Sequence, residues 1–137
     1  MELTGMTTLI MVYDMKESVK FYRDLLGFYV AETSGEEDYY WAKLTKDGMS
    51  LMLNTAYDGD SRPRTRDTQK IRVHNDTIFY FSCKDVRDCY RYFKSKSWPV
   101  AEPVSTHYGM EQVYTNDPDG YEICFQHPVK TNSVFNF

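Results

Sequence analysis

One pattern of residues occurs twice in this chain, and this repeat limits the fold more than any other feature. In each copy an apolar stretch ends at an aspartate, Asp14 in the first copy and Asp85 in the second, 71 positions later. The segments that follow the two predicted helices also resemble each other, as Val30-Ala31-Glu32 and Val100-Ala101-Glu102. An internal duplication is the simplest explanation, so we expect two copies of one supersecondary unit.

Each aspartate is placed to begin a helix. Asp14 lies three residues before Glu17, which is the spacing of a capping box. The apolar residues behind each aspartate recur at helical spacing, so that one face of the helix can pack on a sheet. In the first copy these are Met15, Val19, Tyr22 and Leu26, before Gly27 ends the helix; in the second they are Val86, Cys89, Tyr90 and Phe93, before Trp98-Pro99.

Short apolar or alternating runs predict strands on both sides of each helix. They cover residues 7–13, 28–33, 39–45 and 49–54 in the first copy, and 78–83, 112–115 and 121–126 in the second. Two turns are well specified, Lys46-Asp47-Gly48 in the first copy and Asp117-Pro118-Asp119-Gly120 in the second. Residues 55–76 are polar, and we expect them to form an irregular connection.

Composition excludes several classes of protein. The net charge of -4 and the three cysteines without CxxC spacing argue against a nucleic-acid partner, a disulfide framework and a zinc knuckle, and a cationic or neutral ligand is easier to accommodate. The first residues lack a basic region followed by a long apolar run, and no segment has the roughly 18 apolar residues that span a bilayer. We therefore expect a cytoplasmic protein without a membrane partner.

Two stretches together resemble a known superfamily: VYDMKESVKFYRDLLGFYV at residues 12–30 and YGMEQVYTNDPDGYEICFQHP at residues 108–128. They are similar to the glyoxalase, bleomycin-resistance and extradiol-dioxygenase proteins, also called the vicinal oxygen chelate superfamily. This resemblance implies an α+β fold in which two tandem β-α-β-β-β units form a cup-shaped cleft from curved mixed sheets, within a single domain that commonly forms a homodimer. The expected parts are residues 1–55, a connection at 56–76, residues 77–128 and a tail at 129–137.

Metal-dependent members of that superfamily hold the ion with four cleft residues, typically His or Glu, from the first and last strands of each unit. The matching positions here are occupied by Thr7, Met52, Ile78 and Cys124. These side chains do not suit a hard divalent ion, which needs carboxylates and imidazoles. We therefore expect no bound metal and no cofactor.

The alternation of the strands predicts which side chains face the cleft. Tyr80 and Ser82 are expected there, while Phe79 and Phe81 pack on the second helix. The full set of candidate ligand-binding residues is Met11, Met52, Asn54, Tyr80, Ser82, His107, Cys124 and Gln126. Such a surface suits burial of a small organic ligand, aromatic or cationic, better than acid-base chemistry.

A charged cluster in the connection has no assigned role. It consists of Arg62, Arg64, Arg66, Lys70 and Arg72, and the first copy carries acidic residues at Glu36, Glu37 and Asp38. Both groups are expected to be solvated surface, or to pair between the subunits of a dimer.

Three functions remain open from the sequence. The leading interpretation is a metal-free small-molecule binding or sequestration protein that resembles bleomycin-resistance proteins. The alternatives are a lactoylglutathione-lyase-like or dioxygenase-like enzyme with displaced metal ligands, and a structural or regulatory interaction domain whose cleft is filled by its own side chains.

Overall fold

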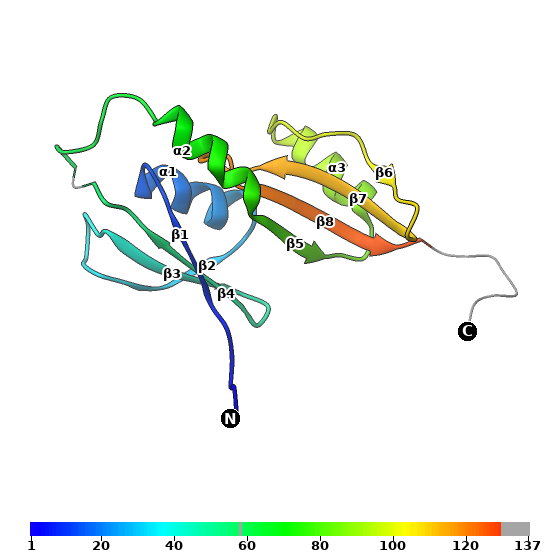
Figure 1. Ribbon diagram of the computed structural model, residues 1–137, viewed down its shortest axis with the longest axis horizontal. Helices are drawn as coiled ribbons and strands as arrows, with labels where there is room; N and C mark the ends of the chain where they lie inside the picture. The colour runs from blue at the N-terminus through cyan, green and yellow to red at the C-terminus, as the bar shows by residue number, and fades with distance from the viewer. Residues whose placement is uncertain (58, 130–137) are drawn as a thin grey trace, which may run out of the picture. The chain divides into compact units, whose positions relative to one another are not determined.

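The computed structural model describes residues 1–57 and 59–129. Their contacts divide the chain into two compact units, the first ending at Lys70 and the second beginning at Ile71, and each unit is described by itself (Figure 1). Each unit has the element order β-α-β-β-β and a four-stranded mixed sheet, as the sequence predicted. Most of the predicted tail, residues 130–137, lies outside the described residues. No helix among the described residues is long and apolar enough to cross a membrane.

The sheet of the first unit has the strand order β1-β4-β3-β2. Its strands are β1 (Thr8–Met11), β2 (Tyr29–Thr33), β3 (Trp41–Lys46) and β4 (Met49–Asn54). β1 runs parallel to β4, and the other neighbours are antiparallel. The turn between β3 and β4 places Asp47 and Gly48 at φ 49° and 81°, which is the left-handed pair that a two-residue hairpin turn requires.

The helix of this unit is α1 (Met15–Lys20), which begins at Asp14 as predicted and continues into a wider π-helical turn, η1 (Phe21–Leu25). The Asp14 carboxylate accepts hydrogen bonds from the backbone N–H groups of Lys16 and Glu17 at 3.0 and 3.4 Å. Because η1 adds a residue to one turn, the apolar stripe moves: Phe21 is buried, whereas the predicted Leu26 is only half-buried. The stripe prediction was therefore wrong at its end, although Gly27, at φ 82°, does terminate the helix.

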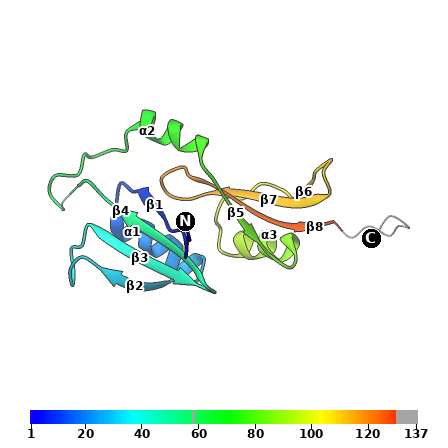
Figure 2. The ribbon, with the colours of Figure 1, turned by 60° about the horizontal axis from the view of Figure 1, so that its bottom comes forward.

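α1 covers one face of the first sheet (Figure 2). Residues that alternate along the strands are buried beneath it, namely Ile10, Ala42, Leu44, Leu51 and Leu53. The intervening residues face the other way, and Leu9 and Met11 remain 44% and 43% exposed. One face of this sheet is therefore packed, and the opposite face of the unit, its open face, is accessible.

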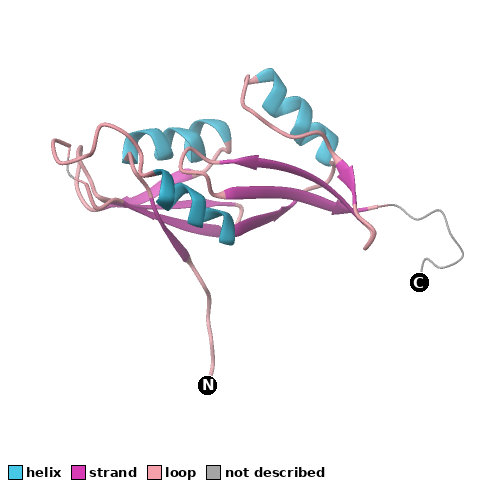
Figure 3. Cartoon of the chain, turned by 45° about the horizontal axis from the view of Figure 1, so that its top comes forward, coloured by secondary structure: helices cyan, strands magenta, loops and turns pink. Residues whose placement is uncertain are grey.

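The second unit repeats this plan with the strand order β5-β8-β7-β6. Its elements are β5 (Ile78–Ser82), α3 (Val86–Ser95), β6 (Val104–Ser105), β7 (Met110–Asn116) and β8 (Glu122–Pro128). α3 starts after Asp85, whose carboxylate accepts from the N–H of Arg87 at 2.8 Å, and packs on one face of β7 and β8 (Figure 3). Its buried residues Val86 and Phe93 belong to the predicted stripe.

The turn between β7 and β8 is held by the buried side chain of Asp117. Its carboxylate accepts hydrogen bonds from the N–H groups of Asp119 and Tyr121, both at 2.9 Å, and Gly120 has φ 84°. This is the turn chemistry that the DPDG sequence predicts.

The connection is more ordered than predicted, because residues 68–76 are helical. They form α2 (Thr68–Val73) and the 3-10 turn η2 (His74–Asp76). The His74 ring stacks on Tyr121 with 3.9 Å between ring centroids, and its Nδ1 lies 2.7 Å from the carbonyl oxygen of Asp119. These contacts with the β7–β8 turn stabilise a helical turn that the polar composition did not indicate.

Candidate ligand-binding site

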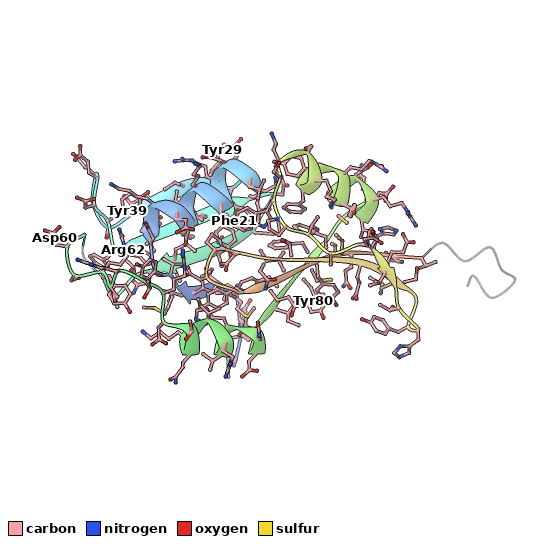
Figure 4. The ribbon with its side chains drawn as sticks, turned by 90° about the horizontal axis from the view of Figure 1, so that it is seen from above. Phe21, Tyr29, Tyr39, Asp60, Arg62 and Tyr80 are labelled. Atoms are coloured by element: carbon pink, nitrogen blue, oxygen red, sulfur yellow. The ribbon has the colours of Figure 1, made fainter. Side chains whose placement is uncertain are left out.

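The open face of the second sheet carries the residues that the strand alternation predicted. Tyr80 is 51% exposed and Ser82 is exposed, whereas Phe79 and Phe81 are half-buried on the opposite face. Phe81 stacks on Phe125 with centroids 5.4 Å apart, in the layer beneath α3. Tyr80 thus presents a free aromatic surface on β5 (Figure 4).

The strand register brings two rows of side chains together on this open face. Tyr80 lies beside Cys124 on β8, and Cys124 lies opposite Tyr114 on β7. In the next row, Ser82 lies beside Gln126, which lies opposite Gln112. Because register partners point to the same side of a sheet, these rows form one continuous surface.

A group of four side chains, Tyr108, Gln112, Tyr114 and Gln126, forms a connected hydrogen-bond network that we call the amide–tyrosine network. The Gln112 amide nitrogen donates to Gln126 Oε1 at 2.9 Å and to the Tyr108 hydroxyl at 3.0 Å. The Tyr114 hydroxyl donates to Gln112 Oε1 at 2.8 Å. Gln112 is only 2% exposed, so its bonds fix it in one orientation at the base of the surface.

The protonation of Tyr114 and Cys124 is also set by this surface. Burial raises the pKa of Tyr114, and its hydrogen bonds with Tyr80 and Cys124 raise it further. Burial likewise raises the pKa of the Cys124 thiol above its ordinary value. Both groups therefore stay protonated at neutral pH, and Cys124 is a poor nucleophile there because the thiolate is the reactive form.

The open face of the first sheet is more apolar. Its register pairs Leu9 with Met52 and Met11 with Asn54 across β1 and β4. The Asn54 side chain lies 3.7 Å from the Met11 sulfur, and Trp41 is the cross-strand neighbour of Asn54 on β3. Flexible thioethers beside an aromatic ring adapt readily to the shape of an organic ligand.

The residues at the superfamily's metal positions do not fit a divalent ion. Within residues 1–57 and 59–129, no three His, Cys, Asp or Glu side chains converge so that they could hold a metal. Met52 and Cys124 belong to the surfaces described above, while Thr7 lies just before β1 and Ile78 begins β5. A hydroxyl, a thioether and an alkyl group do not replace the carboxylates and imidazoles that such an ion needs, and the single thiol of Cys124 does not by itself make a site.

His107 and His127 are placed differently. His107 is exposed in the loop between β6 and β7, with its ring edge-to-face on Tyr108 at 5.1 Å, and it thus lies next to the amide–tyrosine network. His127 instead lies on the covered face. Its Nδ1 accepts from the Val86 N–H at 3.1 Å and its Nε2 lies 3.1 Å from Glu111, so it caps the start of α3.

The arginine cluster is partly paired within the first unit. Arg66 binds Glu17 at 2.5 Å, and Arg62 lies 3.6 Å from Asp14. Solvated surface was therefore the wrong prediction for these two arginines, and their partners are not the acidic residues at 36–38. Glu17 also departs from its predicted capping-box role, because its carboxylate is engaged by Arg66.

Sequence reasoning missed Tyr108, Gln112 and Tyr114 as members of the site. The sequence predicts a strand that contains Gln112 and Tyr114, but among the cross-strand pairs it predicts only the β8 partners, Gln126 and Cys124, as cleft residues. The signal was present in the hairpin: a turn at residues 117–120 fixes the register that places Gln112 opposite Gln126.

The chain belongs to the Glyoxalase/Bleomycin resistance protein/Dioxygenase superfamily, whose family model matches residues 6–125. Among solved structures, it is similar to SMU.1112c, with a TM-score of 0.73 and 22% identity over 92% of this chain and 100% of that chain. It is also similar to TnmS3, an antibiotic binding protein from Streptomyces sp. CB03234, with a TM-score of 0.66 and 20% identity over 93% of this chain and 99% of that one. Virulence protein STM3117 from Salmonella typhimurium gives a TM-score of 0.65 at 15% identity, over 94% and 100% of the two chains. No curated protein matches the chain.

Proposed function

We propose that this protein binds and sequesters a small organic ligand without changing it chemically, and that the open face of the second sheet is the main binding surface. The observation that carries the proposal is the combination of an exposed Tyr80 ring with the amide–tyrosine network beside it, which is anchored by the buried Gln112. A fixed polar base next to a free aromatic surface orients a ligand by a few hydrogen bonds and holds it by burial.

The surface suits a planar, partly polar molecule. Tyr80 offers a ring face for stacking, which is worth roughly 0.5–1.5 kcal/mol beyond the area buried. Ser82 and Gln126, which lie in neighbouring positions on β5 and β8, supply a hydroxyl and an amide that can each donate and accept. His107, exposed beside Tyr108, supplies a further polar contact from a loop.

Nothing in this surface supplies a bond-making step. Cys124 stays a neutral thiol because burial raises its pKa, and Tyr114 stays a neutral phenol for the same reason. Binding is therefore the chemistry that these residues support best. Met11, Met52 and Asn54 on the open face of the first sheet are proposed as further contacts for an apolar part of a ligand.

The superfamily and TnmS3 support this class of function. TnmS3 is an antibiotic binding protein, and a protein with its fold needs no catalytic apparatus to act. We propose by the same reasoning that the ligand is an aromatic or cationic organic molecule, that the protein acts in the cytoplasm, and that it forms a homodimer.

A thermal-shift screen across antibiotics, aromatic acids and thiol conjugates tests the proposal, since a ligand that binds only the folded state raises the Tm. A hit should lose affinity about tenfold in Tyr80→Ala, as expected for the loss of stacking and burial by one ring. Tyr92→Ala is the matched control, because Tyr92 is 40% exposed on α3 of the same unit. If no compound raises the Tm, or if both variants bind equally well, the proposal is wrong.

Elemental analysis of the purified protein distinguishes a metal-dependent enzyme from a metal-free binding protein. An enzyme with displaced ligands requires stoichiometric zinc, iron, nickel or manganese after desalting. We expect none, because the side chains at the metal positions do not match these ions.

A further inference from the structure

The first unit contains a pocket that none of the proposed ligand-binding residues line. Its volume is about 360 Å³, at the lower end of the range for small-molecule sites, which is roughly 300–1,000 Å³. It lies where the start of α1, the loop before β3, the segment after β4 and the beginning of the connection meet; Tyr39, Asp60 and Arg62 mark this end of the unit in Figure 4. Its charged lining residues are Asp14, Lys16, Glu37, Asp38, Asp60 and Arg62.

Acidic groups outnumber basic ones in this pocket. Both lining cations have an acidic partner in the unit, since Arg62 lies 3.6 Å from Asp14 and Lys16 lies 3.7 Å from Asp38. In the part of the chain that the structure describes, Glu37 and Asp60 form no ion pair. Among the described lining residues, Glu37 and Asp60 therefore remain as carboxylates outside an ion pair, and they favour a positively charged ligand.

Tyrosines at this end of the unit already contact cations through their ring faces. The Lys70 ammonium lies 5.8 Å from the centroid of Tyr57, a lining residue, and the Arg66 guanidinium lies 4.8 Å from the centroid of Tyr13. Tyr40 lines the pocket and is 59% exposed as a residue. A ring face of this kind attracts a cation within about 6 Å, so the aromatic and acidic parts of the lining favour the same ligand chemistry.

From these observations we propose that the pocket is a second binding site, which takes a compact organic cation: a protonated amine or guanidinium on a small apolar body. The charged group lies near Glu37 and Asp60 and over the ring face of Tyr40, and the apolar body fills the rest of the pocket. This site is separate from the open sheet faces and does not depend on them.

Titration of the ¹⁵N-labelled full chain with benzylammonium chloride, followed by NMR, tests the site. We expect saturable shifts of the amides of residues 37–40 and 55–57, and an affinity that falls as salt is raised, because the charges are partly exposed. Benzyl alcohol, which has the same ring without the charge, should bind at least about tenfold more weakly. Equal binding of the alcohol, or the absence of saturable shifts at these residues, would overturn the proposal.

Paired variants locate the charged group. Glu37→Gln and Asp60→Asn should each weaken binding of benzylammonium about threefold, and together about tenfold, as for charge pairs that water still screens. Glu36→Gln removes an equivalent charge one residue away, outside the lining, and should leave the affinity unchanged. If Glu36→Gln matters as much as the double variant, only the general negative field attracts the ligand and the site is refuted.

A second pair tests the aromatic contact. Tyr40→Ala should weaken binding several-fold, and Tyr29→Ala, which removes a tyrosine that is 75% exposed and outside the lining, should not. The result is independent of the proposed function, because binding at the open face of the second sheet shifts the amides of residues 80, 112, 114 and 126 instead. If benzylammonium shifts only those amides, the site in the pocket is refuted, and benzylammonium is instead a ligand of the open face of the second sheet.

Discussion

The two units have the same order of elements but very different open faces. In the first unit this face carries Leu9, Met11 and Met52, with little hydrogen bonding between side chains. In the second unit the same face carries Gln112 and Gln126, joined by a hydrogen bond and flanked by tyrosines. The covered faces are alike, since in both units a helix buries alternating apolar residues. Packing constrains the covered face of each copy, and the open faces were free to acquire different chemistry.

The helices of the two units also end differently. The first widens into η1 and stops at Gly27, where the Lys46 ammonium donates to the Leu26 carbonyl at 2.8 Å. The second keeps regular turns to Ser95 and then places Ser97 at φ 54°. In both units the backbone thus leaves the helix through a residue in the left-handed conformation. Only Gly27 adopts that conformation without strain, because Ser97 carries a side chain.

The largest effects should come from the positions at which the units are most alike. Tyr22 and Phe93 are 0% and 2% exposed, and each is the largest fully buried side chain of its own unit. Tyr22→Ala and Phe93→Ala should each lower the free energy of unfolding by about 3–5 kcal/mol, because each leaves a cavity in a packed layer. Urea melts of the two variants measure this effect, with Tyr29→Ala as the exposed control. A loss below about 1 kcal/mol in either variant would show that its unit lacks a packed core.

The next largest effect should be on cysteine reactivity, which reports on the second unit alone because all three cysteines lie in it. Burial, followed by the neighbouring Cys83, raises the pKa of Cys89 to about 12 from 9.0. At pH 8 its thiolate fraction should be well below that of the unfolded chain, by at least about tenfold, and alkylation of Cys89 should slow accordingly. Mass-spectrometric rates of iodoacetamide labelling, with and without denaturant, check this prediction.

The raised pKa of Cys89 also makes the stability of the protein depend on pH. The folded state holds the Cys89 proton more tightly than the unfolded state, so this contribution to stability is complete below about pH 9 and is lost as the pH rises toward about 12. A Cys89→Ala variant should lose less stability over this interval than the natural chain. Identical alkaline profiles would contradict a raised pKa for the half-buried Cys89 thiol.

Exchanging the residues at the helix ends should give effects of opposite sign. Gly27→Ser places a side chain at φ 82°, where its Cβ would lie 2.7 Å from the Lys46 nitrogen, and should cost about 1–2 kcal/mol. Ser97→Gly relieves a strained residue and should stabilise the protein by up to about 1 kcal/mol. The denaturant midpoints of the two variants should therefore move in opposite directions. Movement in the same direction would show that the two helix ends are not equivalent.

Effects of similarly small size should come from the N-caps. Asp85→Ala should cost about 1 kcal/mol of unfolding free energy, and Asp14→Ala somewhat more, because Asp14 also lies 3.6 Å from Arg62. Asp14→Asn keeps the cap acceptor and removes the charge, so the difference between Asp14→Asn and Asp14→Ala measures the cap alone. If both alanine variants have an unchanged denaturant midpoint, neither aspartate acts as a cap.

The sequence predicted the helix starts and the β7–β8 turn well, because these features depend on hydrogen bonds between residues that are close in the sequence. Asp14, Asp85 and the Asp117 turn act on backbone groups within four residues, so their neighbours in the sequence were sufficient to identify them. The superfamily motifs and strand alternation were equally local, and they placed Tyr80 and Ser82 on the open face.

Features that depend on distant partners were missed. η1 is not visible in the spacing of apolar residues, because that spacing assumes regular turns. The helical turns at residues 68–76 depend on His74 stacking on Tyr121, which is 47 positions away. Gln112 became part of a site only through its bonds to Gln126 and Tyr108, and the 360 Å³ pocket needs four separate segments to enclose it.

α2 has a further consequence, which concerns how this chain tolerates insertions. Arg66, before the helix, and Lys70, within it, are tied to the first unit, through Glu17 and beside the Tyr57 hydroxyl respectively. Ile71, within the helix, and His74, just after it, are tied to the second unit, because Ile71 lies against Gly120 and His74 stacks on Tyr121. The boundary between the two units thus falls at a single peptide bond inside α2, between Lys70 and Ile71. Extra residues inserted at this bond would interrupt the backbone hydrogen bonds of α2, so the better place to join a foreign segment is before the helix, between the exposed loop residues Arg64 and Thr65.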